Sequence, residues 1–234
     1  MKQINFESID STNTYLKINY QDLDDLTFVS SKIQTQGHGR NNRIWDSEGN
    51  NLLFSLLIKD KYLFTKTNVI SILSAYTVLN VLQNYGIKDV SIKWPNDVYV
   101  KDKKICGILL ESKSKESLEC LIIGVGINVN QKVFNKEYNA TSISNILNKD
   151  IDIEDFKQDI YKEFVENINK LSNGYDFYKE ISKYDYLKDK EVYALINDEK
   201  KLVKVNGINL DYTLCVVSNG SEFNINSGEV SFHI

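Results

Sequence analysis

The chain has 234 residues, of which 42% are hydrophobic, enough for one large domain or for one domain with a small appendage. Its 28 basic and 32 acidic residues give a formal charge of -4, which argues against a nucleic-acid-binding protein, because phosphates call for a basic face. Cys106, Cys120 and Cys215 are odd in number and far apart, which argues against disulfides and zinc. No run has the apolar length of a signal peptide or a membrane span, so we expect a cytoplasmic protein with no membrane partner.

The first elements are a short strand over residues 2–9 and a helix that starts close behind it. Asp10-Ser11-Thr12-Asn13 contains only helix-capping residue types and precedes Thr14 to Ile18. Two interpretations stay open at this point. These side chains cap the helix and do nothing else, or the free donors of the helix N-terminus also meet a ligand.

A strand predicted over Leu26–Ser31 leads into a loop, Gln34–Trp45, in which Gly37 and Gly39 are followed by arginines. Glycine lets a backbone approach a ligand closely, and guanidinium groups bind carboxylate or phosphate. The loop is not a P-loop, because it lacks the Lys-Ser/Thr ending, and it is not a dinucleotide fingerprint, because it lacks a third glycine. It is either an anion-binding loop or a mobile glycine loop with exposed arginines.

Three further elements are predicted from apolar spacing and are assigned no chemistry. Asn51–Lys59 is a nearly continuous apolar run, typical of a buried strand. Asn68–Tyr85 and Ile153–Leu171 have apolar residues at helical spacing and end at Gly86 and Gly174. We expect both helices to pack on the sheet.

The only proline of the chain, Pro95, interrupts an apolar run. Because proline has no N–H and disfavours helix at the preceding residue, we expect one strand to end at Trp94 and the next to begin at Val98. The bend and its flanks carry polar side chains: Lys93, Asn96, Asp97 and Lys104. The stretch is either a binding site for a polar ligand or a hairpin with solvated charges.

A later strand, predicted over Leu118–Asn130, alternates aliphatic residues with Gly124, Gly126 and Asn128. One of its faces is therefore apolar, while the other has almost no side chains until Asn128. A ligand could lie flat against that face, or another backbone or a helix could pack there. An irregular segment, Phe134–Ser142, follows.

From Lys190 the pattern changes to short alternating strands with Asn-Gly and similar turns. The expected strands are Glu191–Ile196, Leu202–Val205, Tyr212–Val217 and Val230–Ile234. We predict a small antiparallel β-barrel of roughly fifty residues that docks on the larger part. The predicted boundary divides the chain into residues 1–186 and 187–234.

Taken together, these motifs resemble those of the biotin protein ligases, in the same order and over nearly the whole chain. The stretches that carry the resemblance are Asp10-Ser11-Thr12-Asn13, Gln34 to Trp45, Lys93 to Asp97 with Lys104 to Glu111, and Gly124 to Asn130, supported by Ala140-Thr141-Ser142 and Gly228 to Ser231. The resemblance implies an α+β fold, with a mixed β-sheet packed with helices in the manner of a class II synthetase. Some members carry an N-terminal DNA-binding domain, and this chain looks like the ligase-only form.

The resemblance also implies a reaction. Members join biotin to ATP with Mg²⁺, giving biotinyl-5′-AMP and pyrophosphate, and then transfer biotin to a lysine of a biotin carboxyl carrier protein. Positioning and fixed cations supply most of such catalysis, so no protein nucleophile is implied. The resemblance assigns no metal ligand, and Asp97 is expected to help orient the metal or the incoming lysine.

Residue roles follow from the same resemblance. The implied catalytic residues are Lys104, Arg40 and Asp97. The implied biotin-binding residues are Ser11, Thr12, Asn13, Gln34, Gly37, His38, Gly39, Arg40, Trp45, Lys104, Gly107 and Gly124. The implied ATP- and adenylate-binding residues are Arg40, Arg43, Asn96, Lys104, Gly126, Asn128 and Ala140.

The chain departs from the family pattern at His38, Asn42 and His233, where arginine, glycine and arginine occur in other members. A neutral histidine at position 38 supplies less positive field than arginine, so we expect weaker, pH-sensitive retention of the adenylate. Two alternatives stay open: a lipoate or octanoate ligase and a non-catalytic biotin sensor. The sequence names no carrier protein and sets no oligomeric state, although an exposed sheet edge is compatible with a homodimer.

Overall fold

The computed structural model describes residues 2–40, 43–45, 50–135, 138–196, 199–226 and 230–233. The predictions that concern Asn42, Gly228 and the side chain of His233 lie outside this description.

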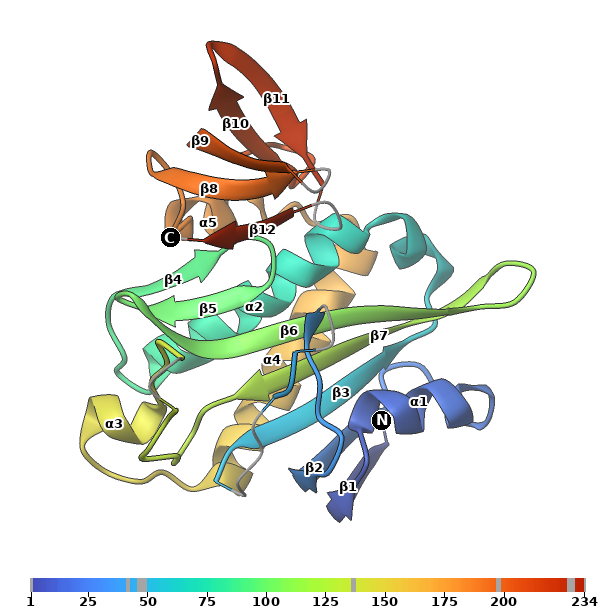
Figure 1. Ribbon diagram of the computed structural model, residues 1–234. Coiled ribbons are helices and arrows are strands. Elements are labelled where there is room, and N and C mark those ends of the chain that lie inside the picture. Colours follow the sequence, from blue (N-terminus) through green and yellow to red (C-terminus); the bar gives the residue numbers. More distant parts are fainter. Residues whose placement is uncertain are drawn as a thin grey trace.

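The larger part of the chain is built on a mixed sheet of seven strands (Figure 1). In spatial order the strands are β1 (Gln3–Ile9), β2 (Phe28–Gln34), β3 (Leu52–Ile58), β7 (Leu118–Ile127), β6 (Lys103–Ser114), β5 (Asp97–Val100) and β4 (Val90–Lys93). The pairing of β1 with β2 is parallel, and the other neighbours are antiparallel. The predicted mixed sheet is confirmed.

Helices cover both faces of this sheet. The helices are α1 (Thr12–Asn19), α2 (Thr67–Asn84), α3 (Ile143–Leu147), α4 (Ile153–Ser172) and α5 (Tyr178–Ile181), with 3-10 turns at Tyr20–Asp22, Lys61–Thr65 and Ser182–Tyr184. The long helices α2 and α4 run behind the sheet in Figure 1 and share its large apolar core. The opposite face carries the smaller core around Leu16 and Tyr20 of α1 and its 3-10 extension.

The two-residue period of β7 explains why the site lies where it does. Leu121, Ile123 and Val125 point into the core shared with α2 and α4, whereas Cys120 and Ile122 pack beneath α1. The next positions on the α1 face are the two glycines of the strand. Beyond the N-terminus of α1, this face of β7 therefore has almost no side chains.

The prediction at Pro95 is correct to within one residue. β4 ends at Lys93 and β5 begins at Asp97, and the Trp94–Pro95 peptide bond is cis. Trp94 is buried, with 2% of its surface exposed, and its indole N–H donates to the carbonyl of Tyr212 at 3.0 Å. The bend is thereby tied to the C-terminal part of the chain.

The C-terminal strands form a second, antiparallel sheet, which lies above the first in Figure 1. Its spatial order is β11 (Ser221–Ile225), β10 (Leu214–Ser218), β9 (Glu199–Ile208), β8 (Glu191–Ile196) and β12 (Val230–His233). β11 and β12 lie at opposite edges and do not pair, so over the described residues the predicted small barrel is an open sheet. Two elements were not predicted: β11, which is mostly polar, and α3, which spans only five residues.

Candidate active site

A cavity of about 390 Å³ opens on the α1 face of the large sheet, beyond the N-terminus of α1. Every residue that the resemblance places in the biotin or ATP site lines this cavity, except Gly37. The residues come from the start of α1, the loop after β2, the bend between β4 and β5, strands β6 and β7, and the segment after β7. The four sequence motifs are therefore parts of one site.

The floor of the cavity consists of glycine backbone from β6 and β7. Gly107 pairs directly with Gly126, and Gly124 pairs with Leu109. A Cβ atom on Gly107 would lie 2.9 Å from Cζ3 of Trp45, and one on Gly126 would overlap the same indole. A Cβ atom on Gly124 would overlap the side chain of Asn13. A larger side chain at these positions therefore requires Trp45, Lys104 or Asn13 to move.

Trp45 lies on this floor, where a flat ligand would also lie. Its loop is closed by a bridge between His38 and Ile44 and by a hydrogen bond from the Trp45 N–H to the Gly37 carbonyl at 3.0 Å. The indole Nε1 is buried and has no hydrogen-bond partner in the described part of the chain. No hydrogen bond of this N–H therefore holds the indole in place, and leaving a buried N–H unpaired is unfavourable.

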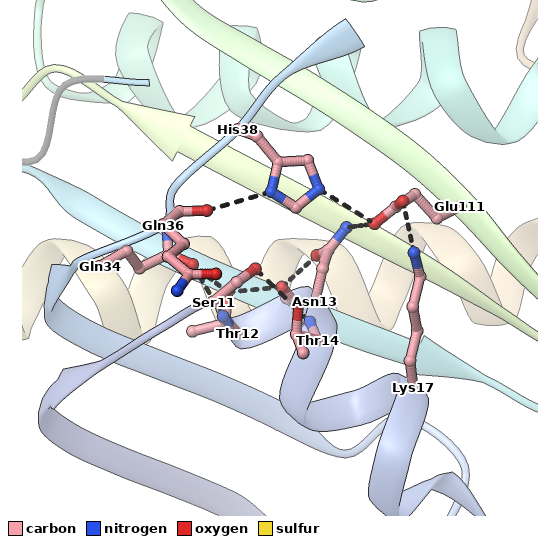
Figure 2. Close-up of polar contacts among 10 residues, drawn as sticks. Ser11, Thr12, Asn13, Thr14, Lys17, Gln34, Gln36, His38 and Glu111 are labelled. Carbon is pink, nitrogen blue, oxygen red and sulfur yellow. Dashed lines mark hydrogen bonds and ion pairs between the residues drawn. The ribbon is translucent and has the colours of Figure 1, made fainter. Parts of the chain in front are cut away.

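The wall beside α1 is a network of short polar contacts (Figure 2). Ser11 is the N-cap of α1, and its Oγ accepts from the N–H of Thr14 at 3.4 Å. Gln34 Oε1 accepts from the backbone N–H of Thr12 at 2.7 Å and lies 3.2 Å from its hydroxyl. The network continues through Ser55 of β3, which the sequence analysis did not select. A serine alone in the apolar run Leu-Leu-Phe-Ser-Leu-Leu-Ile is the signal that could have identified it.

Cationic side chains, among them Lys104 and Arg40, lie at the other end of the cavity. Lys104 Nζ lies 2.7 Å from Asp97 Oδ1, an ion pair that lacks hydrogen-bond geometry. Arg40 Nη1 donates to Asn96 Oδ1 at 3.1 Å, and Asn96 Nδ2 donates to the Ile108 carbonyl at 2.8 Å. Burial lowers the pKa of the Arg40 guanidinium, and Asp97 counters this effect. Arginine nevertheless stays charged. Asn96, in the bend after Pro95, therefore holds the permanent positive charge of Arg40 at the cavity.

The segment after β7 holds Lys104 in place. The Lys104 N–H donates to the Asn139 carbonyl, and the Lys104 carbonyl accepts from Thr141, both at 2.9 Å, on either side of Ala140. Asn128 is buried, and its Nδ2 donates to the Thr141 carbonyl at 3.0 Å. In the structure, therefore, the side chain of Asn128 supports the segment that fixes Lys104, next to the cavity.

Lys93 is a cavity residue to which the sequence analysis gave no role. It lines the cavity beside the predicted cations, and burial lowers its pKa, with Asp97 opposing and Lys104 adding to that shift. Its place in the Lys-Trp-Pro-Asn-Asp run was visible in the sequence, but lysines are also common in solvated hairpins. Arg43 lines the cavity too, from an exposed position in the loop.

His38 faces the α1 side of the site. Its Nδ1 lies 3.1 Å from the Gln36 carbonyl, and its Nε2 lies 3.9 Å from Glu111 Oε2 (Figure 2). A protonated ring would therefore pair with Glu111 of β6.

The described residues contain neither a metal-binding cluster nor a membrane-spanning helix. Within them no group of three or more His, Cys, Asp or Glu side chains is arranged to hold a metal ion. No helix in the same residues is long and apolar enough to cross a membrane.

Known proteins with similar sequences and structures agree with this geometry. The chain is 29% identical to the biotin protein ligase from Aquifex aeolicus, whose structure was solved in complex with biotin and ATP, with a TM-score of 0.88 over 99% of this chain and 98% of that one. It is 38% identical over 132 residues to the bifunctional ligase/repressor BirA of Bacillus subtilis, and 34% identical over 123 residues to that of Escherichia coli. These matches cover 54% and 52% of this chain but only 41% and 38% of the two relatives.

The profile of the biotin/lipoate A/B protein ligase family matches residues 5–128, which is more than half of the chain. This range contains the glycine loop, the bend after Pro95, Lys104 and both glycines of β7. The chain therefore belongs to the biotin/lipoate A/B protein ligase family.

Proposed function

We propose that the protein is an ATP-dependent biotin–protein ligase, which forms biotinyl-5′-AMP and transfers biotin to a lysine of a biotin carboxyl carrier protein. The observation that carries this proposal is the cavity itself, with a glycine floor at one end and a cluster of cations at the other. A flat ring fits on the first, and phosphates are attracted to the second. The similarity to a ligase solved with biotin and ATP supports it.

In the first step the carboxylate of biotin attacks the α-phosphorus of ATP. A new C–O–P bond forms, the bond between the α- and β-phosphates breaks, and pyrophosphate leaves. Both reactants are anionic, so the cations must offset their repulsion and the charge of the transition state. In this proposal Lys104, whose backbone is hydrogen-bonded and whose side chain pairs with Asp97, binds the α-phosphate, and Arg40 and Arg43 bind the outer phosphates.

A magnesium ion would supply further positive charge when it enters with ATP. Asp97 is the one acidic side chain that lines the cavity in the described residues. Mg²⁺ is commonly held by one or two carboxylates together with substrate phosphates and water, so a single carboxylate fits such an ion. Asp97 would hold it.

Trp45 has to leave the floor before a flat ligand can lie there. We infer that the indole then covers the bound ligand, because its loop is closed on itself by the hydrogen bond between Trp45 and Gly37 and is tied to the bend after Pro95 by the Arg40–Asn96 hydrogen bond. A closed loop would exclude water, which would otherwise hydrolyse the mixed anhydride.

In the second step the neutral amine of the carrier lysine attacks the carbonyl carbon of the adenylate. An amide bond forms, the bond to the phosphate oxygen breaks, and AMP leaves. Asp97 is the acidic group available to orient this amine, because it lines the cavity beside Lys104.

The decisive experiment incubates the purified protein with biotin, ATP, Mg²⁺ and a purified carrier domain. We expect ATP-dependent addition of one biotinyl group to the carrier, detected by mass spectrometry, with one pyrophosphate released. A protein that binds biotin but forms no adenylate would favour the biotin-sensor alternative. Faster transfer of lipoate or octanoate than of biotin would favour the other ligase.

Cellular location and assembly belong to the same proposal. The three cysteines are buried free thiols, which supports a reducing, cytoplasmic location. Homodimerisation through a sheet edge stays a prediction, which light scattering of the purified protein would test.

A further inference from the structure

A buried polar chain runs behind the cavity wall, from strand β3 to helix α1 and strand β6. Ser55, with 0% of its surface exposed, is the only polar residue of β3. Its Oγ lies 2.6 Å from Thr12 Oγ1 and donates a hydrogen bond to Asn13 Oδ1. Thr12 and Asn13 line the cavity, and Ser55 lies behind them. Ser55 therefore reaches a ligand only through its two neighbours.

Glu111, at the β6 end of this hydrogen-bond network, sets the orientation of Asn13. Glu111 accepts from Lys17 Nζ at 2.5 Å and from Asn13 Nδ2 at 2.7 Å (Figure 2). Burial raises the pKa of Glu111, but the hydrogen bonds from Lys17 and Asn13 outweigh burial, so the pKa lies below its usual value. The carboxylate is ionised and can only accept hydrogen bonds. The amide nitrogen of Asn13 must face Glu111, and its oxygen must face Ser55.

The single proton of each hydroxyl group then determines the remaining directions. Ser55 gives its proton to Asn13, so the proton in the 2.6 Å contact between Ser55 and Thr12 must come from Thr12. The other acceptor near the Thr12 hydroxyl in the network, Gln34 Oε1, is farther away at 3.2 Å and already accepts from the Thr12 backbone N–H. The proton of Thr12 therefore points to Ser55, which does not line the cavity, and Thr12 presents only lone pairs to a ligand.

We propose that Ser55 is a positioning residue that sets ligand specificity, because it turns the Thr12 hydroxyl into an acceptor that requires an N–H group on the ring of the ligand. This inference rests on the proposed function. A cyclic urea carries such N–H groups, whereas the dithiolane ring of lipoate carries none. A buried acceptor left without a donor lowers affinity, and sites built around such a group strongly reject analogues that lack the donor.

The first test is Ser55→Ala, assayed by pyrophosphate release at varied biotin concentration. Without Ser55 the Thr12 proton is free to turn towards the cavity. We expect the KM for biotin to rise about tenfold, while kcat and the KM for ATP stay within about twofold. Ser74→Ala is the matched control, because Ser74 is also buried and, within the described residues, its hydroxyl bonds only the Ile70 carbonyl of its own helix. The control should leave all three constants unchanged.

The second test compares biotin with its two cyclic carbamate analogues, in each of which one ring N–H is replaced by oxygen. The wild-type protein should reject the analogue that places oxygen opposite Thr12. Ser55→Ala should reduce that discrimination about tenfold, because the freed hydroxyl can donate to the ring oxygen. Loss of folded protein lowers the rate for every ligand equally and does not change this ratio.

These experiments distinguish a failure of the proposed function from a failure of the role assigned to Ser55. If the wild-type protein forms no adenylate from biotin, the proposed function fails. If it forms the adenylate and the ratio of kcat/KM values is the same in Ser55→Ala, only the role of Ser55 is overturned. Should the alanine variant not fold, Ser55→Cys has a similar size and a thiol that is a weak acceptor. It must shift the ratio in the same direction for the inference to stand.

Discussion

Replacing Gly124 by alanine tests whether the wall of the site is rigid. The added Cβ atom would overlap the Asn13 side chain, which is held from two sides by Ser55 and Glu111. At Gly126, two residues along the same strand, the added atom would instead overlap the indole of Trp45. The two substitutions add the same methyl group to the same face, but one meets a fixed side chain and the other a loop side chain.

The expected cost follows from these contacts. Overpacking a well-packed site costs about 1–3 kcal/mol, and losing one of the Asn13 hydrogen bonds adds about 1 kcal/mol. We therefore expect Gly124→Ala to lower the free energy of unfolding by about 2–4 kcal/mol, which for a chain of this size corresponds to a Tm lower by about 4–16 °C. Gly126→Ala should cost less than about 1 kcal/mol, because the Trp45 indole, which has no hydrogen-bond partner in the described residues, can move aside.

Urea denaturation and calorimetry of both variants provide the measurement, with biotin titration as the functional readout. Both variants should bind biotin more weakly, since either methyl group raises the floor. Only Gly124→Ala should lose substantial stability. A Gly124→Ala variant as stable as the wild type, or a Gly126→Ala variant that is the less stable of the two, would contradict a rigid wall at Asn13.

Three further predictions concern charge. Lys104→Ala should lower the rate of adenylate formation by about 10²- to 10³-fold without changing the Tm, because one fixed cation at the α-phosphate is lost; near-normal turnover would contradict its role. The pKa of Glu111 lies below its usual 4.5 in the folded state, so its contribution to stability is complete above that pH and is lost as the pH falls through the lowered value. Glu111→Gln should therefore flatten the acid side of the stability curve measured by urea denaturation, and an unchanged slope would rule this out. His38→Arg should slow the release of bound adenylate, most at a pH where histidine is neutral; equal release rates at all pH values would disprove the expected effect of His38.

Local patterns predicted most of the fold because they act over a few residues. Helix spacing and a following glycine located α2 and α4 to within one or two residues, and the lack of an N–H in Pro95 located the break between β4 and β5. The same patterns failed for β11, where exposed polar residues alternate weakly, and for α3, which is too short to show a period. The open edge between β11 and β12 depends on how the ends of the second sheet meet, which no local pattern reports.

Four motifs in the order of one family were enough to select most of the glycines, cations and bend residues that line the cavity. How these residues act on one another depends on tertiary contacts. Thr12 and Ser55 are 43 positions apart, and their contact depends on how α1 sits on β3. The directions of the Thr12 and Ser55 hydroxyl protons depend on hydrogen-bond partners from α1, β3 and β6. Trp45 rests on the floor because two strands leave a surface without side chains, and that surface exists only after β6 and β7 pair in register.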